Sequence, residues 1–347
     1  MSLTKRLDEK LASIRCGQGT AADFIIADAK DADMAFGVTA PGPDCSRGAH
    51  TESHGQWKTL ADYRQQIRDV IAQGIVDIVL LSASNLEQLA MREGLFIDSP
   101  ITPAARANDT TDIWAVRGGK YASTPSRAFH TASIEHIKYG RLQSDCSQPH
   151  VGADLGLYSI TFTNNVEWDY QSLLEFTAFR HEAERKGFRY FLEVFNPNTD
   201  PGIEPKRIGE FLNDHIIRAL AGVTSVGRPL FLKIPYNGPG PLEELVAYDP
   251  NLIVGVLGGS NGTTYDAFKL IYDAKLHGAW VALFGRKINL SEHPLTFIEM
   301  LRRIVDGEVT PKEAVKIYHD RLKTLGITPQ RDLHADTQLT EQVMRYN

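Results

Sequence analysis

Short apolar runs alternate with helical patterns along most of this chain, and this alternation limits the possible folds more than any other feature. Most of the runs are apolar at odd and even positions alike, which is typical of strands buried on both faces. Strands that alternate with helices favour a parallel sheet, and eight of them favour a closed α/β barrel. The predicted strands are Phe24–Asp28, Val76–Ser82, Ile101–Arg106, Leu155–Phe162, Tyr190–Phe195, Leu230–Pro235, Leu252–Leu257 and Trp280–Phe284.

Helices are predicted before, between and after these strands. An apolar stripe at helical spacing opens the chain, formed by Leu3, Leu7, Leu11 and Ile14. Near the other end, the run Thr310-Pro-Lys-Glu313 is a capping box with proline at the first helical position, so a helix should run from there to Leu325. The other predicted helices are Thr59–Gln73, Leu86–Arg92, Tyr170–Lys186, Lys206–Ala221, Leu242–Tyr248, Tyr265–His277 and Pro294–Val305.

An open dinucleotide-binding sheet is the competing fold. Its glycine fingerprint would follow the first strand, but the chain after Asp28 reads AKDADMAFG. Two segments rich in glycine, proline, histidine and charge, about 29–57 and 107–150, are interpreted as insertions after strands one and three. Without them and a C-terminal extension over about 307–347, roughly 230 residues remain, the size of a bare (β/α)8 barrel. We therefore predict a single barrel domain over 1–347, with both insertions on the face where barrel active sites lie.

Composition excludes several classes of protein. The 347 residues are 42% hydrophobic, so the chain is globular rather than disordered. A net charge of −6 gives no electrostatic footprint for nucleic acid or an anionic membrane, and the apolar runs are too short to span a bilayer. The three cysteines form no CxxC pair, which is typical of a reducing compartment without structural zinc. With no signal-type N-terminus, we expect a cytoplasmic protein.

The sixth predicted strand carries a lysine inside an apolar run. It reads Arg228-Pro-Leu-Phe-Leu-Lys233-Ile-Pro-Tyr236, and lysine is rarely fully buried without a partner. Burial penalises the charged ammonium, so a desolvated amine at a strand end becomes available as a nucleophile toward a carbonyl carbon. The alternative is a structural lysine that extends to solvent or pairs with a carboxylate. This feature alone leaves both interpretations open.

Single acids stand at the ends of two other predicted strands. Glu193 lies in the run FLEVF of the fifth strand, and Asp28 ends the first strand, shortly before Lys30. Each acid alone is interpreted as the partner of a strand-end cation. Because the carboxyl ends of barrel strands meet at one mouth, the two acids and Lys233 together indicate proton donors and acceptors around a nucleophilic amine.

Glycine-rich turns follow the last two strands, where barrels commonly bind phosphate. The run LGGSNGTT occupies residues 257–264, and Phe284 is followed by Gly-Arg. Glycines let backbone N–H groups approach a phosphate, a helix N-terminus favours anions, and arginine adds charge-assisted hydrogen bonds. A tight turn with a threonine N-cap is the alternative. The predicted phosphate ligands are Gly258, Gly259, Ser260, Gly285 and Arg286.

Other polar residues are also candidates for the site. Lys30 and Arg106 are predicted to bind substrate or an anionic group, and Asn108, Asp109 and Asp112 either orient substrate hydroxyls or serve as turn residues. His50 and His54 have a spacing that metal ligands use, but their context GAHTESHGQ is loop-like and lacks the HExxH arrangement. No metal and no cofactor is therefore predicted.

Four motifs in this order resemble the class I aldolases of the barrel superfamily that includes tagatose-1,6-bisphosphate aldolase and the archaeal-type fructose-bisphosphate aldolases. They are IIADAK, FLEVF, FLKIPYNGP and the pair GGSNGTT and LFGR, within residues 20–30 and 150–305. The resemblance implies that Lys233 is the Schiff-base lysine, Asp28 the strand-one acid and Glu193 the strand-five glutamate. It also implies that Gly258, Gly259, Gly285 and Arg286 grip a phosphate.

By the same resemblance, the reaction is reversible aldol cleavage of a phosphorylated ketose to dihydroxyacetone phosphate and an aldehyde, with no metal. Such enzymes commonly form homo-oligomers, which makes one possible here, with the number open. The fourth strand departs from the tagatose-type enzymes because it lacks their lysine. The archaeal-type enzymes use a tyrosine as proton donor near this place, and Tyr158 is its candidate match, subject to the register of the strand.

Two other functions fit the same sequence. A phosphosugar isomerase or epimerase would use the carboxylates as acid and base, with Lys233 as an electrostatic stabiliser only. A non-catalytic barrel that binds a phosphorylated metabolite would account for the missing strand-four lysine. The three hypotheses share a small phosphorylated or carbonyl-bearing ligand as the partner.

Overall fold

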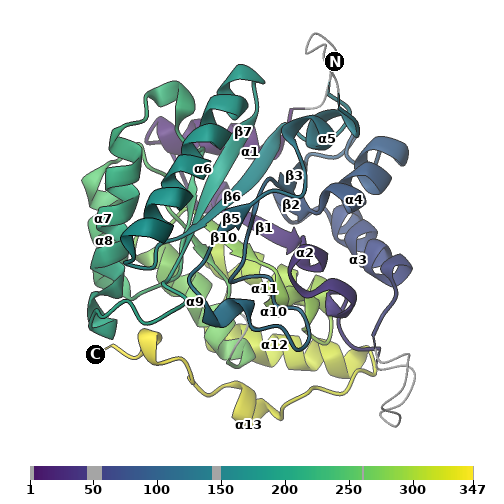
Figure 1. The fold of residues 1–347 in the computed structure, drawn as a ribbon. Coiled ribbons are helices and arrows are strands. Elements are labelled where there is room, and N and C mark those ends of the chain that lie inside the picture. The colour runs from purple at the N-terminus through teal and green to yellow at the C-terminus, as the bar shows by residue number, and fades with distance from the viewer. Residues whose placement is uncertain (1–3, 45–56, 143–149, 260–261, 347) are drawn as a thin grey trace.

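A sheet of eight parallel strands, surrounded by helices, forms the centre of the molecule (Figure 1). The computed structural model describes residues 4–44, 57–142, 150–259 and 262–346. The strands are β1 (Ile25–Lys30), β2 (Ile78–Leu81), β3 (Thr102–Arg106), β6 (Leu155–Thr161), β7 (Arg189–Phe195), β8 (Leu232–Lys233), β9 (Gly255–Leu257) and β10 (Val281–Phe284). They follow the order β8-β7-β6-β3-β2-β1-β10-β9, and all eight predicted strands are present.

Backbone hydrogen bonds join the two end strands of that order, β8 and β9. The Ile234 N–H donates to the Gly255 carbonyl at 2.9 Å, and the Leu257 N–H donates to the Ile234 carbonyl at 2.9 Å. The sheet thus curves round until its edges meet, which confirms the predicted (β/α)8 barrel and excludes the open dinucleotide-binding sheet.

Helices follow the strands as the alternation predicts. Within the longer connections, β4 (Asp109–Thr110) and β5 (Ala128–Phe129) form a small antiparallel pair after β3. The helix predicted at Leu86–Arg92 is instead a short α-helix that continues as a π-helical segment over Glu87–Arg92. The helices are α1 (Arg6–Arg15), α2 (Ala32–Phe36), α3 (Leu60–Gln73), α4 (Ala83–Leu86), α5 (Ile134–Tyr139), α6 (Val166–Arg185), α7 (Ile208–Ala221), α8 (Pro239–Tyr248), α9 (Thr264–Leu276), α10 (Arg286–Asn289), α11 (Pro294–Val305), α12 (Pro311–Thr324) and α13 (Leu333–Asp336).

Two apolar clusters show which way each strand residue points. The smaller cluster fills the barrel and takes alternate residues of β1, β2, β6 and β10, for example Ile25, Ala27 and Ala29 of β1. The larger cluster takes the other residues, such as Ile26, together with the helices that pack outside the sheet. Strand residues of one parity therefore face the interior and those of the other parity face the helices.

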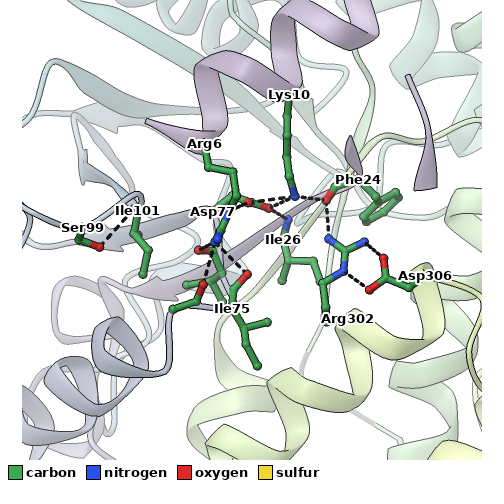
Figure 2. A network of polar contacts seen from close by, with 12 residues as sticks. Arg6, Lys10, Phe24, Ile26, Ile75, Asp77, Ser99, Ile101, Arg302 and Asp306 are labelled. Atoms are coloured by element: carbon green, nitrogen blue, oxygen red, sulfur yellow. Dashed lines mark hydrogen bonds and ion pairs between the residues drawn. The ribbon is translucent and has the colours of Figure 1, made fainter. Parts of the chain in front are cut away.

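Helix α1 closes the amino-terminal end of the barrel. Leu7 and Leu11 of α1 belong to the interior cluster, and the polar side of the helix is tied to β2. The carboxylate of Asp77, which is fully buried, accepts hydrogen bonds from the Arg6 Nε at 2.6 Å and the Lys10 Nζ at 3.0 Å (Figure 2). It also accepts one from the Ile26 N–H at 2.8 Å, so a single acid joins α1, β1 and the start of β2.

Candidate functional site

A cavity of about 210 Å³ opens at the carboxyl end of the barrel. Strands on opposite sides of the barrel contribute its polar floor, and the glycine-rich turns after β9 and β10 contribute its rim. The lining residues are Ala29, Asp31, Ala32, Ala35, Phe36, Arg106, Asp112, Ile113, Ala115, Glu193, Phe195, Lys233, Leu257, Gly258, Gly259, Leu283, Gly285 and Arg286.

Three polar side chains lie side by side on adjacent strands at the floor of this cavity. The register pairs Ser159 of β6 with Glu193 of β7, and Glu193 with Lys233 of β8. The Lys233 Nζ forms an ion pair with the Glu193 Oε1, and the Ser159 hydroxyl donates to the Glu193 Oε2 at 2.7 Å. Lys233 and Glu193 are only 7% and 1% exposed. A buried amine thus lies beside a carboxylate that can accept its proton.

Arg106 of β3 extends this row to the first strand. Its Nε donates to the Asp31 Oδ2 at 2.5 Å, its Nη1 donates to the Ser159 Oγ at 3.1 Å, and its Nη2 lies 3.7 Å from the Glu193 Oε2. Burial would lower the pKa of Arg106, but Asp31 and Glu193 hold that pKa above its usual value. The guanidinium therefore stays charged and fixes both carboxylates.

The position of Ser159 depends on a side-chain amide. Asn108 accepts a hydrogen bond from the Ser159 N–H at 2.6 Å and donates to the Ser159 carbonyl at 2.8 Å. Of the residues predicted past β3, Asn108 therefore holds Ser159 in position and does not itself line the cavity. Asp112 lines the cavity and accepts from the Thr161 hydroxyl at 2.8 Å, while Asp109 accepts from the Thr131 hydroxyl at 3.0 Å.

The predicted acid and lysine of the first strand do not line the cavity. Asp28 and Lys30 have the parity of Ile26, so both point away from the barrel interior. There the Lys30 Nζ lies 3.2 Å from the Asp28 Oδ2 and donates to the Asn289 Oδ1. Burial raises the pKa of Asp28 and lowers that of Lys30. The strand-one acid at the cavity is Asp31 instead, two residues beyond the inward Ala29.

Tyr158 is likewise turned away from the cavity. It is fully buried in the outer cluster, where its ring centroid lies 4.5 Å from that of Phe179 and 5.1 Å from that of Phe176. Its hydroxyl has no hydrogen-bond partner among the described residues, and burial raises its pKa. Tyr158 therefore does not reach the cavity where the sequence predicted a proton donor, and the inward residue at this level is Ser159.

The rim of the cavity is built from close-packed glycines and one arginine. A Cβ atom on Gly258 would lie 2.2 Å from the Phe284 ring, one on Gly285 would lie 2.9 Å from the Ala29 Cβ, and Gly259 has φ +58°. The Arg286 guanidinium lies 5.6 Å from the Phe36 ring centroid and forms no ion pair with the described residues. Burial lowers the pKa of Arg286, although arginine remains protonated.

Residues from the connections after β1 and β3 form the outer wall. Ala32, Ala35 and Phe36 come from α2, and Ile113 and Ala115 follow β4. This part of the wall is apolar, in contrast to the polar floor. Lys233, Glu193, Arg106 and Asp31 are therefore paired at the floor, whereas Arg286 at the rim forms no ion pair with the residues that the structure describes.

Three of the predicted or weighed residues cannot be placed, and the described residues contain neither a metal-binding cluster nor a membrane helix. Ser260, His50 and His54 lie outside the described residues. Within the described ranges, no group of three or more His, Cys, Asp or Glu side chains is arranged to hold a metal ion. Among the residues that the structure describes, no helix is both long and apolar enough to cross a membrane.

Sequence reasoning did not single out Asp31 and Phe36, which line the cavity, or Ser159, which hydrogen-bonds to Glu193. A signal for Asp31 exists in the parity of β1, because Ala27, Ala29 and Asp31 share one face and small residues suit a crowded barrel interior. No comparable signal marks Ser159, since its neighbours on the strand are apolar on both sides.

Comparison with solved structures shows which proteins have a similar fold. No protein-family model matches the sequence, and no curated protein matches it significantly. Among solved structures, a fructose-bisphosphate aldolase from Slackia heliotrinireducens matches with a TM-score of 0.63 and 13% identity, covering 91% of each chain. An archaeal fructose 1,6-bisphosphate aldolase matches with a TM-score of 0.59 and 17% identity, covering 87% of this chain and 99% of its own.

A further archaeal aldolase structure is described as having its catalytic lysine covalently bound to the carbinolamine intermediate of the substrate. It matches with a TM-score of 0.59 and 16% identity over 86% of this chain and 99% of its own. At these identities the likeness concerns the fold. The chain therefore has the barrel architecture of Schiff-base aldolases and resembles them remotely.

Proposed function

We propose that this protein is a class I aldolase that cleaves a phosphorylated ketose reversibly through a Schiff base on Lys233, releasing dihydroxyacetone phosphate and an aldehyde. One observation carries the proposal: the Lys233 amine and the Glu193 carboxylate are paired in a cavity whose rim holds the Arg286 guanidinium, which forms no ion pair with the described residues. A nucleophile, a proton acceptor and an anion-binding group are the parts that such a reaction needs. The remote likeness to aldolase structures supports the same assignment.

The covalent step begins with proton transfer from Lys233 to Glu193, with which it is paired. The neutral amine then adds to the ketose carbonyl carbon, and the carbonyl oxygen takes up a proton to give a carbinolamine. That hydroxyl leaves as water after a second proton transfer, which produces a protonated imine. Glu193 is held for this role by the Ser159 hydroxyl and by Arg106.

Carbon–carbon cleavage then uses the imine nitrogen as the electron sink. A base removes the proton from the hydroxyl of the aldehyde half, the C–C bond electrons move to the imine, and an enamine remains on Lys233. The enamine carbon takes back a proton, and water hydrolyses the imine to release dihydroxyacetone phosphate. We assign the base to Asp31, because it lines the cavity whereas Asp28 and Tyr158 do not.

The phosphate is assigned to the rim. Gly259 faces open space, Gly258 and Gly285 let the two turns pack closely against Phe284 and Ala29, and Arg286 supplies a guanidinium that forms no ion pair with a described carboxylate. A phosphate held there would orient the ketose within a cavity of about 210 Å³ whose floor carries Lys233. With the phosphate bound at the rim and the amine on the floor, the ketose carbonyl would lie between them.

Borohydride trapping tests the proposal directly. Reduction in the presence of a panel of ketose phosphates should leave an adduct with the mass of the ketose fragment on Lys233, read by peptide mass spectrometry. Lys233→Met should abolish both adduct and turnover, whereas Lys206→Met, which changes a lysine 80% exposed on the surface, should leave both unchanged. An adduct on another lysine would overturn the assignment of Lys233, whereas appreciable turnover by Lys233→Met would favour an isomerase or epimerase that uses the carboxylates.

A further inference from the structure

A second hollow lies at the opposite end of the barrel from the proposed reaction site. It has a volume of about 720 Å³ and includes Arg189 and Tyr190 at the start of β7, Leu230 just before β8 and Leu252 just before β9. These are the amino-terminal ends of the strands, whereas the cavity around Lys233 opens at their carboxyl ends. The hollow is therefore separate from the proposed aldolase chemistry.

Four arginines line this hollow, which we call the arginine hollow: Arg15, Arg180, Arg189 and Arg228. Two of them are neutralised locally. Arg189 pairs with Asp8 at 2.5 Å and with Asp154 at 2.9 Å, and Arg228 pairs with Asp249 at 2.6 Å. The charges of these two guanidiniums are thus compensated by carboxylates of the protein itself.

The other two arginines have no such compensation within the described part of the chain. Arg15, the last residue of α1, donates only to the Leu230 carbonyl at 3.3 Å. Arg180 of α6 donates to the Thr177 hydroxyl at 3.4 Å, and its buried Nε has no hydrogen-bond partner. Two guanidiniums without paired carboxylates therefore border one hollow, against the single lining acid Glu184.

The rest of the lining suits an organic group rather than a bare ion. Phe188, Val223 and Leu252 are buried apolar residues of the wall, and a volume of about 720 Å³ exceeds the needs of inorganic phosphate. Guanidinium groups bind phosphate oxygens through paired N–H donors and stay charged at neutral pH. The protein as a whole carries a net charge of −6, so this excess of positive charge is local.

We propose that the arginine hollow binds a small organic phosphate, with Arg15 and Arg180 holding the phosphate and the apolar wall holding its organic part. The ligand is a phosphate monoester whose organic part is of nucleoside size or smaller. Because the hollow shares no lining residue with the Lys233 cavity, the proposal is independent of the aldolase assignment.

Calorimetric titration tests this proposal with two phosphate esters, dihydroxyacetone phosphate and adenosine 5′-monophosphate, and with inorganic phosphate. All titrations use an Arg286→Met background, so that the rim of the proposed reaction site contributes little. We expect saturable binding of at least one ester, with inorganic phosphate binding more weakly. The ester that binds identifies the source of the phosphate as a triose-type or a nucleoside-type ligand.

The decisive variant is Arg15→Met/Arg180→Met, which should weaken binding about tenfold or more. Its matched control is Arg92→Met/Arg207→Met, which removes the same charge from arginines 65% and 64% exposed elsewhere and should leave binding within about twofold. Arg180→Lys keeps the charge without the planar fork and should weaken binding several-fold. Absence of saturable binding of both esters, or equal losses in the double variant and its control, would overturn the proposal.

Discussion

Replacement of Glu193 by Gln tests the central pair of the proposed reaction site with almost no change in shape. The amide still offers an oxygen to the Ser159 hydroxyl, which donates to the carboxylate at 2.7 Å. The substitution nevertheless removes the proton acceptor beside Lys233, because an amide does not take up a proton at neutral pH. A general acid or base accelerates a reaction by a factor of about 10² to 10⁴, which corresponds to a reduction of about 3–5 kcal/mol in the activation free energy. We therefore expect kcat to fall by that factor.

The same substitution should also lower the free energy of unfolding, by an amount that follows from the contacts of the pair. Lys233, 7% exposed, loses its carboxylate partner, while Arg106 keeps Asp31 at 2.5 Å. Breaking a buried pair in this way costs about 3–5 kcal/mol, within the usual total of about 5–15 kcal/mol, so the variant should fold.

Two measurements separate the catalytic effect from the structural one. Urea unfolding gives the change in free energy, and the initial rate of borohydride-trapped adduct on Lys233 gives the effect on imine formation in the folded enzyme. Glu210→Gln, at a glutamate 53% exposed on α7, serves as the control and should change neither. A Glu193→Gln enzyme with kcat within about threefold of the wild type would refute the assigned role of Glu193.

Three further predictions concern residues outside that pair. Tyr158→Phe removes a buried hydroxyl without a described partner, so it should leave turnover unchanged and alter the free energy of unfolding by no more than about 1 kcal/mol; a large loss of kcat would restore Tyr158 as the proton donor. Asp77→Ala leaves Arg6 and the buried Lys10 without their shared carboxylate, and urea unfolding should show a loss of about 3–5 kcal/mol; a loss under 1 kcal/mol would contradict the anchoring of α1 by this acid. Burial raises the pKa of Asp33 to about 6, so the folded state binds its proton more tightly than the unfolded state does, and this group should lower stability by at most about 3 kcal/mol as the pH rises from about 4 to 6. Unfolding free energies across that range should decline less in Asp33→Asn, and an identical decline in both proteins would contradict the assignment.

The sequence by itself determined the architecture and the two most important residues of the proposed site. Alternating strand and helix patterns are local, and they are enough to predict eight parallel strands around a barrel. Lys233 and Glu193 stand out because each is a single charge within an apolar strand, and a buried charge requires a partner. The structure supplies that partner by placing the two residues opposite each other in adjacent strands.

Only the tertiary structure decided which face of each strand the other residues occupy. On the first strand the sequence favoured Asp28, whereas the structure places Asp31 at the cavity. On the fourth strand of the barrel the sequence favoured Tyr158, whereas the inward residue is Ser159. Both strands are buried toward the barrel interior and toward the helices, so their apolar residues do not alternate with polar ones. Without that alternation, small residues such as Ala27 and Ala29 on the face that Asp31 shares are the one parity signal in the first strand, and the fourth strand has none. The inward face is set by how neighbouring strands pair and close the barrel.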